Sequence, residues 1–375
     1  MSDREIREKP DAIDATLEML EVIELENTLY SLMKNDTPVA NMNTRLTSIL
    51  KRTSIYKPLL PETNRDSIVK YFFTRPRCNL SRSNIIMDRV LAKLLKSKGN
   101  SIEKYVRVLL DPFLGYKFNK EYVDSELNLV DEPFMPILNN TINTASGHPD
   151  PIIDTFTSKE GVMKEQVTHY DGTDKIFNSW DMTVTFNNVV GEGVWLLIDT
   201  WVRYGTLVKS ALMPYTRYLL GRQIDYQSCL YTIVLDTDGR SIKHTASTML
   251  FPTATTKGSI FDTAKGTSKR SGDGDVMVRF KCLGAEYDDP ITSFEFNKHV
   301  ATFAPSLRGY LDGDITGSDY IVVPPNIYKR FSTKCIPFID LYAGKLEWLV
   351  LKDEVVNLKE DYLKILKTLG DKTNG

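Results

Sequence analysis

Apolar and polar residues alternate in the middle of the chain with the period of two that β-strands show. Residues 180–186, WDMTVTF, place four apolar side chains on one face and three polar ones on the other. The same texture runs over 226–235 and 240–250, and the turn sequence Asp236-Thr237-Asp238-Gly239 between them predicts a hairpin. Residues 276–283 alternate as well. The pattern therefore predicts a sheet built from one strand, a hairpin and a further strand.

Helical spacing appears on both sides of these strands. Apolar residues at steps of three and four from Val194 to Val208 predict one helix, which Pro214 follows. The first third of the chain also reads as helical, and its candidate caps are Asp11 or Asp14, Ser83 and Asn100. We expect helices there over 13–32, 83–99 and 100–110. Near the end of the chain, strands are expected over 321–323 and 346–351, followed by a helical stripe over 358–369.

Together these elements predict an α+β protein in three parts. Residues 1–125 form a helical docking region, 126–300 a β-sandwich or barrel with one packed helix, and 301–375 a small α/β extension. Four prolines lie among Asn and Thr near the start of the second part, which suits an extended connector; they are Pro133, Pro136, Pro149 and Pro151. Residues 256–275, rich in Gly, Ser, Thr and Lys, are expected to form a mobile loop that a partner orders.

Charge changes sign along the chain although it nearly cancels overall. The chain has 47 Lys and Arg against 49 Asp and Glu, a formal net charge of −2. Residues 1–36 carry a net −6, residues 37–120 a net +12 and the remainder a net −8. The overall balance argues against a protein that coats nucleic acid along its whole length. No apolar run reaches the roughly 18–20 residues of a membrane span, and no secretory signal opens the chain, so we expect a cytosolic product without a membrane partner.

The residue pattern gives little support to metal or catalytic chemistry. The four cysteines and four histidines are scattered, without the spacing of a metal site, and the cysteines are expected to be buried and reduced. Three carboxylate pairs could in principle bind Ca²⁺ or Mg²⁺, but their contexts favour turns; they are Asp236 with Asp238, Asp288 with Asp289, and Asp312 with Asp314. No nucleophile elbow is present, though a triad assembled in space or a carboxylate pair facing a cleft stays open. We expect no enzyme, cofactor, metal or small-molecule substrate.

The basic segment 37–120 offers the best surface for a partner. Its Lys and Arg residues are interleaved with Tyr and Phe, the mixture found in grooves that follow a nucleic-acid backbone. The interpretation that we favour is a docking surface for an acidic protein partner. The candidate docking residues, in this segment and in the loop over 256–275, are Arg45, Lys51, Arg52, Arg75, Arg77, Arg82, Lys257, Lys265, Lys269 and Arg270.

The middle of the chain resembles structural proteins from the virions of large contractile-tailed bacteriophages. The segments that carry the resemblance are KIFN (175–178) with the strand after it, the Trp-rich helix through Trp201 and Tyr204, IDYQSCLYTIVLD (224–236) and MVRFKCLGAEYDDPITSFEFN (277–297). The order of elements is similar to the tail-tube fold shared by tube subunits, baseplate tube initiators and related contractile injection systems. The resemblance covers about 160–300.

The resemblance implies a structural protein that assembles with itself. Tube-like domains form rings, usually hexameric, by joining sheets edge to edge, and long loops such as 256–275 pack against the next ring. The extensions on either side of the β domain suit a specialised position, such as the junction of tube and baseplate. The protein would be made in the host cytoplasm, incorporated into the virion tail and bound to neighbouring tail or baseplate proteins. The alternative is a nucleic-acid-binding phage protein that uses segment 37–120.

Overall fold

The computed structural model describes residues 67–95, 101–112, 132–173, 175–189, 191–210, 212, 225–255, 275–323, 335–353 and 355. The chain divides into two units, Met1–Asp66 and Ser67–Gly375, and all of the described residues belong to the second. That unit contains both helices and strands, in agreement with the predicted α+β class.

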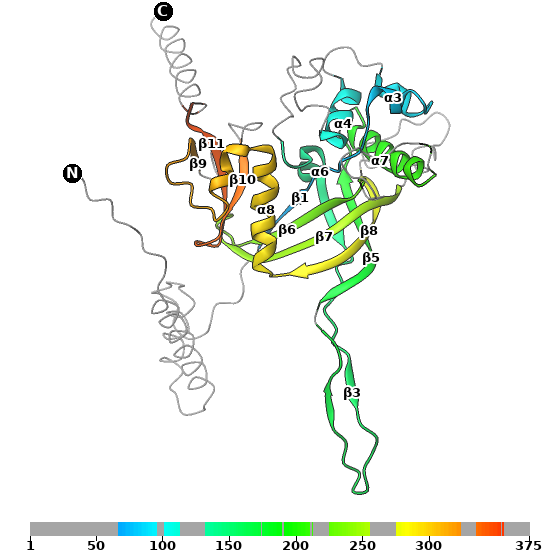
Figure 1. Cartoon of the computed structure of the whole chain (residues 1–375), viewed down its shortest axis with the longest axis vertical. Coiled ribbons are helices and arrows are strands. Elements are labelled where there is room, and N and C mark those ends of the chain that lie inside the picture. The colour runs from blue at the N-terminus through cyan, green and yellow to red at the C-terminus, as the bar shows by residue number, and fades with distance from the viewer. Residues whose placement is uncertain are drawn as a thin grey trace, which may run out of the picture. The chain divides into compact units, whose positions relative to one another are not determined.

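Six antiparallel strands form the main sheet, which curves into a nearly closed barrel (Figure 1). In spatial order they are β1 (Ile68–Phe73), β6 (Ser228–Leu235), β7 (Ile242–Thr255), β8 (Asp275–Tyr287), β5 (Ile176–Asn187) and β2 (Ile142–Ser146). Helix α6 (Pro136–Thr141) leads from the outer side of β1 to β2. Met135, just before α6, donates its N–H to the Phe73 carbonyl at 2.8 Å. The side chain of Asn139, within α6, accepts the Phe73 N–H at 2.9 Å. This segment therefore covers the end of β1.

One face of the sheet packs against a group of helices that includes α7 (Gly193–Lys209) and α4 (Ile102–Leu110). The buried residues of β5 on this face are Met182, Val184 and Phe186, as the alternation in the sequence predicts. Gly193 begins α7 against two isoleucines, because a Cβ there would lie 2.7 Å from Cδ1 of Ile137 and 2.9 Å from Cδ1 of Ile102. A larger residue at the start of α7 would therefore require these two isoleucine side chains to shift.

The opposite face carries a second apolar core beneath α8 (Pro290–Phe303). Adjacent residues of a strand point to opposite faces, so Phe73 of β1 lies in the first core and Phe72 in the second. Phe296 of α8 packs against Phe72 and Phe134, with ring centroids 5.2 and 5.0 Å away. The 3-10 helix η5 (Pro305–Gly309) and a three-stranded sheet complete this side of the unit, in the strand order β10 (Ile336–Asp340), β11 (Lys345–Leu351) and β9 (Tyr320–Val323).

His299 on α8 is half-buried, and its imidazole is neutral in the folded protein at neutral pH. Its Nε2–H donates to the Pro133 carbonyl at 2.9 Å, and two phenylalanine rings lie beside it. Burial is the main reason why the pKa of His299 is lowered to about 4. The hydrogen bond to Pro133 opposes this shift, as Glu295 does more weakly, and the positive charges of Arg77 and Arg75 add to it.

We expect the free energy of unfolding to fall by on the order of 2 kcal/mol as the pH drops from about 6.5 to about 4. The unfolded chain binds a proton at His299 below its ordinary pKa, whereas the folded chain does not until the pH reaches the lowered value. Urea unfolding across this range measures the change. In His299→Gln, which keeps a side-chain N–H for the carbonyl, the decline should be shallower, and an equal decline in both proteins would contradict the assignment.

The predicted helix over 83–99 is wrong over its described part. The structure has a short helix α3 (Arg82–Ile85), with Ser81 rather than Ser83 as N-cap, and a 3-10 helix η1 (Leu91–Leu95). Between them the Asp88 carboxylate accepts the N–H groups of Val90 and Leu91, at 2.9 and 3.0 Å. These side-chain bonds replace the helical ladder, so only part of the apolar stripe becomes buried.

The dipeptide Asp289-Pro290, predicted to be a turn, begins α8 instead. The Asp289 carboxylate accepts the Ile291 N–H at 2.9 Å as a helix cap, and Pro290 occupies the first turn, where no N–H is required. The extended connector expected around Pro133 to Pro151 likewise contains α6 and β2. The predicted turn before β7 is confirmed, since Gly239 donates its N–H to the Asp236 carbonyl at 2.9 Å with a φ of 69°.

The remaining predicted elements divide into confirmed and undescribed ones. The strands over 180–186, 226–235, 240–250, 276–283, 321–323 and 346–351 correspond to β5, β6, β7, β8, β9 and β11, and the helices from 194 and from 100 to α7 and α4. Ser101, not Asn100, caps α4 with its side chain. The four cysteines form no disulfide, as expected; Cys78 and Cys282 are buried, whereas Cys229 and Cys335, expected to be buried too, are only half-buried. The helix over 13–32, residues 256–274 of the loop, Pro214 and the stripe over 358–369 lie outside the described residues. The region 1–125 was predicted to be helical, but its described part also contains a strand, since Ile68–Phe73 form β1 of the main sheet.

Candidate assembly surfaces

A long hairpin, described over residues 150–173 and at 175, extends from the body of the unit, and we call it the arm (Figure 1). Within the arm, β3 (Thr155–Thr157) and β4 (Thr168–Tyr170) pair as a two-stranded antiparallel sheet, with Phe156 opposite His169. Every described residue of the arm is exposed except Ser158, which is half-buried. A hairpin of two strands is marginally stable in water without a surface to pack on. The arm is therefore a candidate contact for another molecule.

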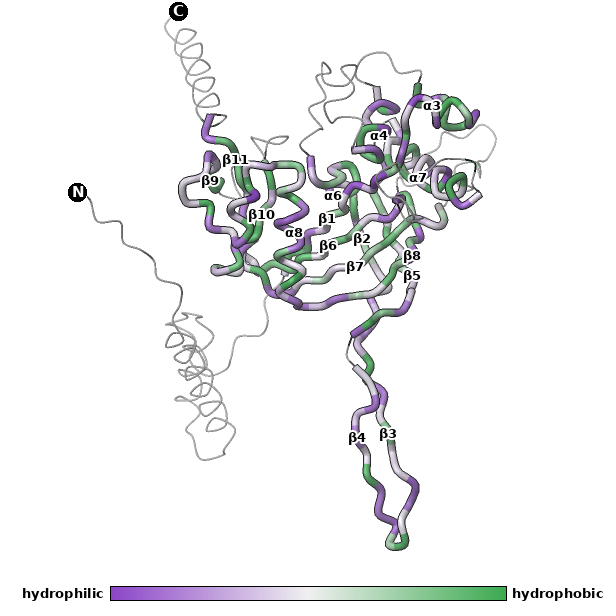
Figure 2. Tube along the Cα trace, in the orientation of Figure 1, coloured by the Kyte–Doolittle hydropathy of each residue, from purple (hydrophilic) through white to green (hydrophobic). Residues whose placement is uncertain are grey.

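Large apolar side chains are exposed along the arm and at its base. Single exposed apolar residues are ordinary, but a set of them on one extended element marks an interaction surface. Figure 2 shows hydrophobic residues distributed along the arm and at its tip. The exposed large apolar residues are Ile152, Ile153, Phe156, Val162, Met163, Val167, Tyr170 and Phe177.

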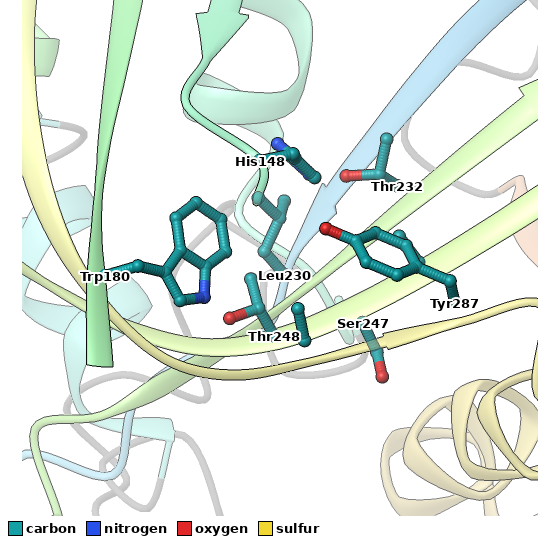
Figure 3. A pocket seen from close by; sticks show the side chains of 9 residues that line it. His148, Trp180, Leu230, Thr232, Ser247, Thr248 and Tyr287 are labelled. Carbon is teal, nitrogen blue, oxygen red and sulfur yellow. The ribbon is translucent and has the colours of Figure 1, made fainter. Parts of the chain in front are cut away.

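Side chains from β5, β6, β7 and β8, together with His148 after β2, gather at the base of the arm (Figure 3). The Tyr287 hydroxyl donates to the Pro149 carbonyl at 2.8 Å, and the His148 ring lies 5.4 Å from that of Trp180. Trp180 in turn donates its Nε1–H to the Gly284 carbonyl at 3.2 Å. These contacts fix the direction in which the arm leaves the body, and burial among them lowers the pKa of His148.

The main sheet has two edges, and they differ in how well they are covered. The β1 strand carries a charged residue, Lys70, and the segment around α6 covers the end of this edge. At β2, residues 142–146 read INTAS, without a charge or a proline, and pair only with β5 among the described strands. Proteins usually protect exposed edges with Lys, Pro or a covering element. The β2 edge has none of these protections in its sequence and is suited to pairing with another strand.

A third surface lies where the predicted helix over 83–99 is interrupted. Ile86, Met87 and Val90 are exposed there, and we call this surface the α3 corner. Asp88 between them forms an ion pair with Arg203 of α7 at 2.6 Å, and this hydrogen bond is the main reason why the pKa of Asp88 is lowered. The corner is thereby held on α7 in a fixed geometry.

The predicted docking residues fall into three groups. Arg75 is 4% exposed and donates to three backbone carbonyls, so it has a structural role in this unit. Arg77 and Arg82 are exposed, near the α3 corner in sequence. The others lie outside the described residues: Arg45, Lys51, Arg52, Lys257, Lys265, Lys269 and Arg270. Docking by these residues stays a prediction, as does the alternative that segment 37–120 binds nucleic acid.

Sequence reasoning missed the arm, although one signal was available. Two short runs of β-branched and aromatic residues, TFT and THY, flank Gly161, and such a pair is typical of a hairpin. Each run is only three residues long, too short for a period to be recognised. The α3 corner carries no sequence signal at all, because its exposure follows from the interruption at Asp88.

The carboxylate pairs stabilise loops and caps. Asp238 accepts the N–H groups of Arg240 and Ser241 at 2.8 and 2.9 Å, and Asp288 accepts the Thr245 N–H at 2.8 Å. Among the residues that the structure describes, no three His, Cys, Asp or Glu side chains come together as a metal site. In the same ranges, no helix has the length and apolar character needed to span a membrane.

The chain was compared with protein families, curated proteins and solved structures. The solved structures similar to the chain include the tube-terminating cap of the anti-feeding prophage, at 10% identity and a TM-score of 0.26, over 42% of this chain and 83% of that chain. No curated protein matches the chain. A family model described as a putative phage tail tube protein matches residues 39–367. Because this match spans most of the chain, the protein belongs to the family of putative phage tail tube proteins and is a structural component of the phage tail.

Proposed function

We propose that the protein is a non-enzymatic ring subunit of the tail tube, placed where the tube meets the baseplate. Copies would join edge to edge into a closed ring, which we expect from the resemblance to contain six copies. The observation that carries the proposal is the unprotected edge of β2 on a nearly closed sheet. The segments before and after the sheet would bind neighbouring tail or baseplate proteins.

Edge pairing in this sheet would be head to tail. The two free edges belong to different strands, β2 and the first half of β1, where Ile68 and Val69 are exposed. A contact that joins two different surfaces of the same protein repeats from copy to copy, and it closes into a ring when the rotation between copies divides a full turn. Strand addition would also pair the backbone N–H and C=O groups on the side of β2 that faces no other described strand.

We expect a lysine at the β2 edge to prevent ring formation. Thr144→Lys adds a charge to an exposed side chain of β2, and a charge is costly to bury at the centre of a new strand pair. Light scattering after size exclusion should give the mass of a closed ring for the wild-type chain and the mass of a monomer for Thr144→Lys.

The matched control adds the same charge to an inner strand. Met277 is exposed on β8, which is paired on both sides, so Met277→Lys should form rings of unchanged mass. The proposal would fail if the wild-type chain stayed monomeric at every protein and salt concentration. It would also fail if both lysine variants assembled equally well.

A further inference from the structure

The arm joins the body through a neck that has little pairing of its own. We define the neck as residues 147–153, between β2 and β3, and residues 172, 173 and 175, between β4 and β5. Among these described residues, no hydrogen bond joins one side of the neck to the other. The first side begins at Gly147, with a φ of 109°, and the second at Gly172. Glycines permit backbone rotations that other residues resist, which is the property of a hinge.

Beyond the neck the arm is held together by its own hydrogen bonds. Asp171 donates its N–H to the Asp154 carbonyl at 2.7 Å, and the paired part of the arm begins there. Beyond the ladder of β3 and β4, Ser158 donates its N–H to the Val167 carbonyl at 2.8 Å. Val167 donates its own N–H to the Ser158 hydroxyl at 2.9 Å. The paired part of the arm can therefore keep its shape while the neck bends.

Two side chains, His148 and Tyr287, hold the neck against the sheet, and we call them the latch (Figure 3). Tyr287 of β8 donates its hydroxyl to the Pro149 carbonyl at 2.8 Å, and the His148 ring lies 5.4 Å from that of Trp180. His148, Trp180 and Tyr287 line one hollow that leaves no room for a water molecule. One hydrogen bond and one ring contact contribute little free energy, so they can break while the sheet stays folded.

The charge of His148 decides how well the latch holds. Burial lowers the pKa of this half-buried histidine, so the latched protein binds a proton there less readily than a protein whose imidazole is in water. Tyr287 is the other titratable side chain at the hollow, and it stays protonated because burial, and then the charge of Asp150, raise its pKa. The strands contribute no charged side chain to the hollow, whose remaining residues are Trp180, Leu230, Thr232, Ala246, Ser247, Thr248 and Ala285. Acid therefore shifts the balance toward an arm that has left the latch.

We propose that the neck is a hinge, on which the paired part of the arm swings as one body when His148 and Tyr287 leave the hollow. At neutral pH the latch holds the arm in the direction that Figure 1 shows. In acid the imidazolium of His148 is more stable in water than in the hollow, so the arm is released. The direction of the arm is thus a property that can change while the sheet stays intact.

The distance between a spin label at the arm tip and one on the body tests the hinge. Met163→Cys and Tyr342→Cys, both at exposed positions, carry the labels in the full chain. The labelled chain is diluted with unlabelled protein so that each distance is measured within one copy, and the wild-type chain measures labelling of its own cysteines. Tyr287→Phe removes the hydrogen bond of the latch. It should raise the ratio of released to latched arms by about two- to tenfold and so broaden the distance distribution.

Two controls separate a swinging arm from a general loss of structure. Tyr320→Phe also removes a tyrosine hydroxyl, one that lies 3.1 Å from the Ser306 hydroxyl and far from the arm in sequence, and it should leave the distribution unchanged. Labels at Met163→Cys and Phe156→Cys both lie on the paired part of the arm and should keep one distance in every variant. A spread of this internal distance in Tyr287→Phe would overturn the motion as one body.

Acid should have the same effect as loss of the Tyr287 hydroxyl. Lowering the pH from about 7.5 to about 5 should broaden the distribution between tip and body, since this range includes the ordinary pKa of histidine. His148→Phe keeps an uncharged ring beside Trp180 and should abolish the response. A response that persists in His148→Phe would overturn the role of His148 as the acid-sensitive part of the latch. One unchanged distribution in wild type and Tyr287→Phe, at both pH values, would overturn the hinge.

Discussion

Replacing Arg75 with Met is expected to lower the free energy of unfolding by about 3–5 kcal/mol, a large part of the stability of a typical domain. The buried guanidinium donates to the carbonyls of Val108, Leu109 and Glu132, at 2.6, 3.3 and 3.0 Å. Val108 and Leu109 belong to the last turn of α4, whose carbonyls have no partner within the helix. Met would fill much of the space but leave these carbonyls without a donor.

Arg77→Met is the matched control for this prediction. Arg77 is exposed two residues further along the chain, so the same change there should alter the free energy of unfolding by less than about 1 kcal/mol. Urea denaturation followed by circular dichroism gives both values. Similar losses in the two variants would show that Arg75 does not hold α4 in the way that its contacts indicate.

Replacing Asn297 with Leu is expected to have a comparable effect, about 3–5 kcal/mol. Asn297 of α8 is fully buried, and its amide nitrogen donates to the carbonyls of Leu311 and Ile339, at 2.9 and 2.7 Å. Its amide oxygen accepts the Ile339 N–H at 2.8 Å. Leu has a similar size but offers no hydrogen bond, so three backbone groups that tie α8 to β10 and to the loop after η5 would become unpaired in the core.

The neighbouring residue supplies the control. Lys298 is exposed on α8 and pairs only with Glu295, at 2.8 Å, in the described contacts of its ammonium group. Lys298→Leu should change the free energy of unfolding by less than about 1 kcal/mol, since an exposed ion pair contributes little. Thermal or urea unfolding of the two variants distinguishes the cases. An unchanged unfolding midpoint in Asn297→Leu would mean that these three hydrogen bonds add no net stability.

Regular alternation explains why part of the fold could be predicted from the sequence. In β5 and β8 one face is buried and the other exposed along most of the strand, so burial and polarity follow the same period. Helix α8 breaks this correspondence, because its buried face includes Thr292 and Asn297 beside Phe296 and Val300. A face that mixes amides and hydroxyls with apolar residues gives no clear stripe, and Asp289-Pro290 has the composition of a turn as well as of a helix start.

The candidate assembly surfaces were harder to predict from the sequence, for a related reason. The charge of Arg75 suggested a partner, but its hydrogen-bond partners at 108, 109 and 132 are brought to it only by the fold. The exposure of Met87 follows from the interruption at Asp88, whose carboxylate accepts the N–H groups of Val90 and Leu91 and also pairs with Arg203, 115 residues away. Spacing along a chain reveals amphipathic elements, whereas ion pairs between distant segments need the three-dimensional structure.

The pairing of β1 also has a consequence for how the chain folds. Thr74 and Ser228, whose hydroxyls lie 3.3 Å apart at the end of the β1 and β6 pair, are 154 residues apart in the sequence. During synthesis, the first described strand must therefore wait until β6 has left the ribosome before its ladder forms. Contacts of such long separation are slow to form, because the intervening chain must be closed into a loop first. The barrel, and with it the geometry of both edges, is thus completed late, and the proposed pairing of copies at these edges would have to follow it.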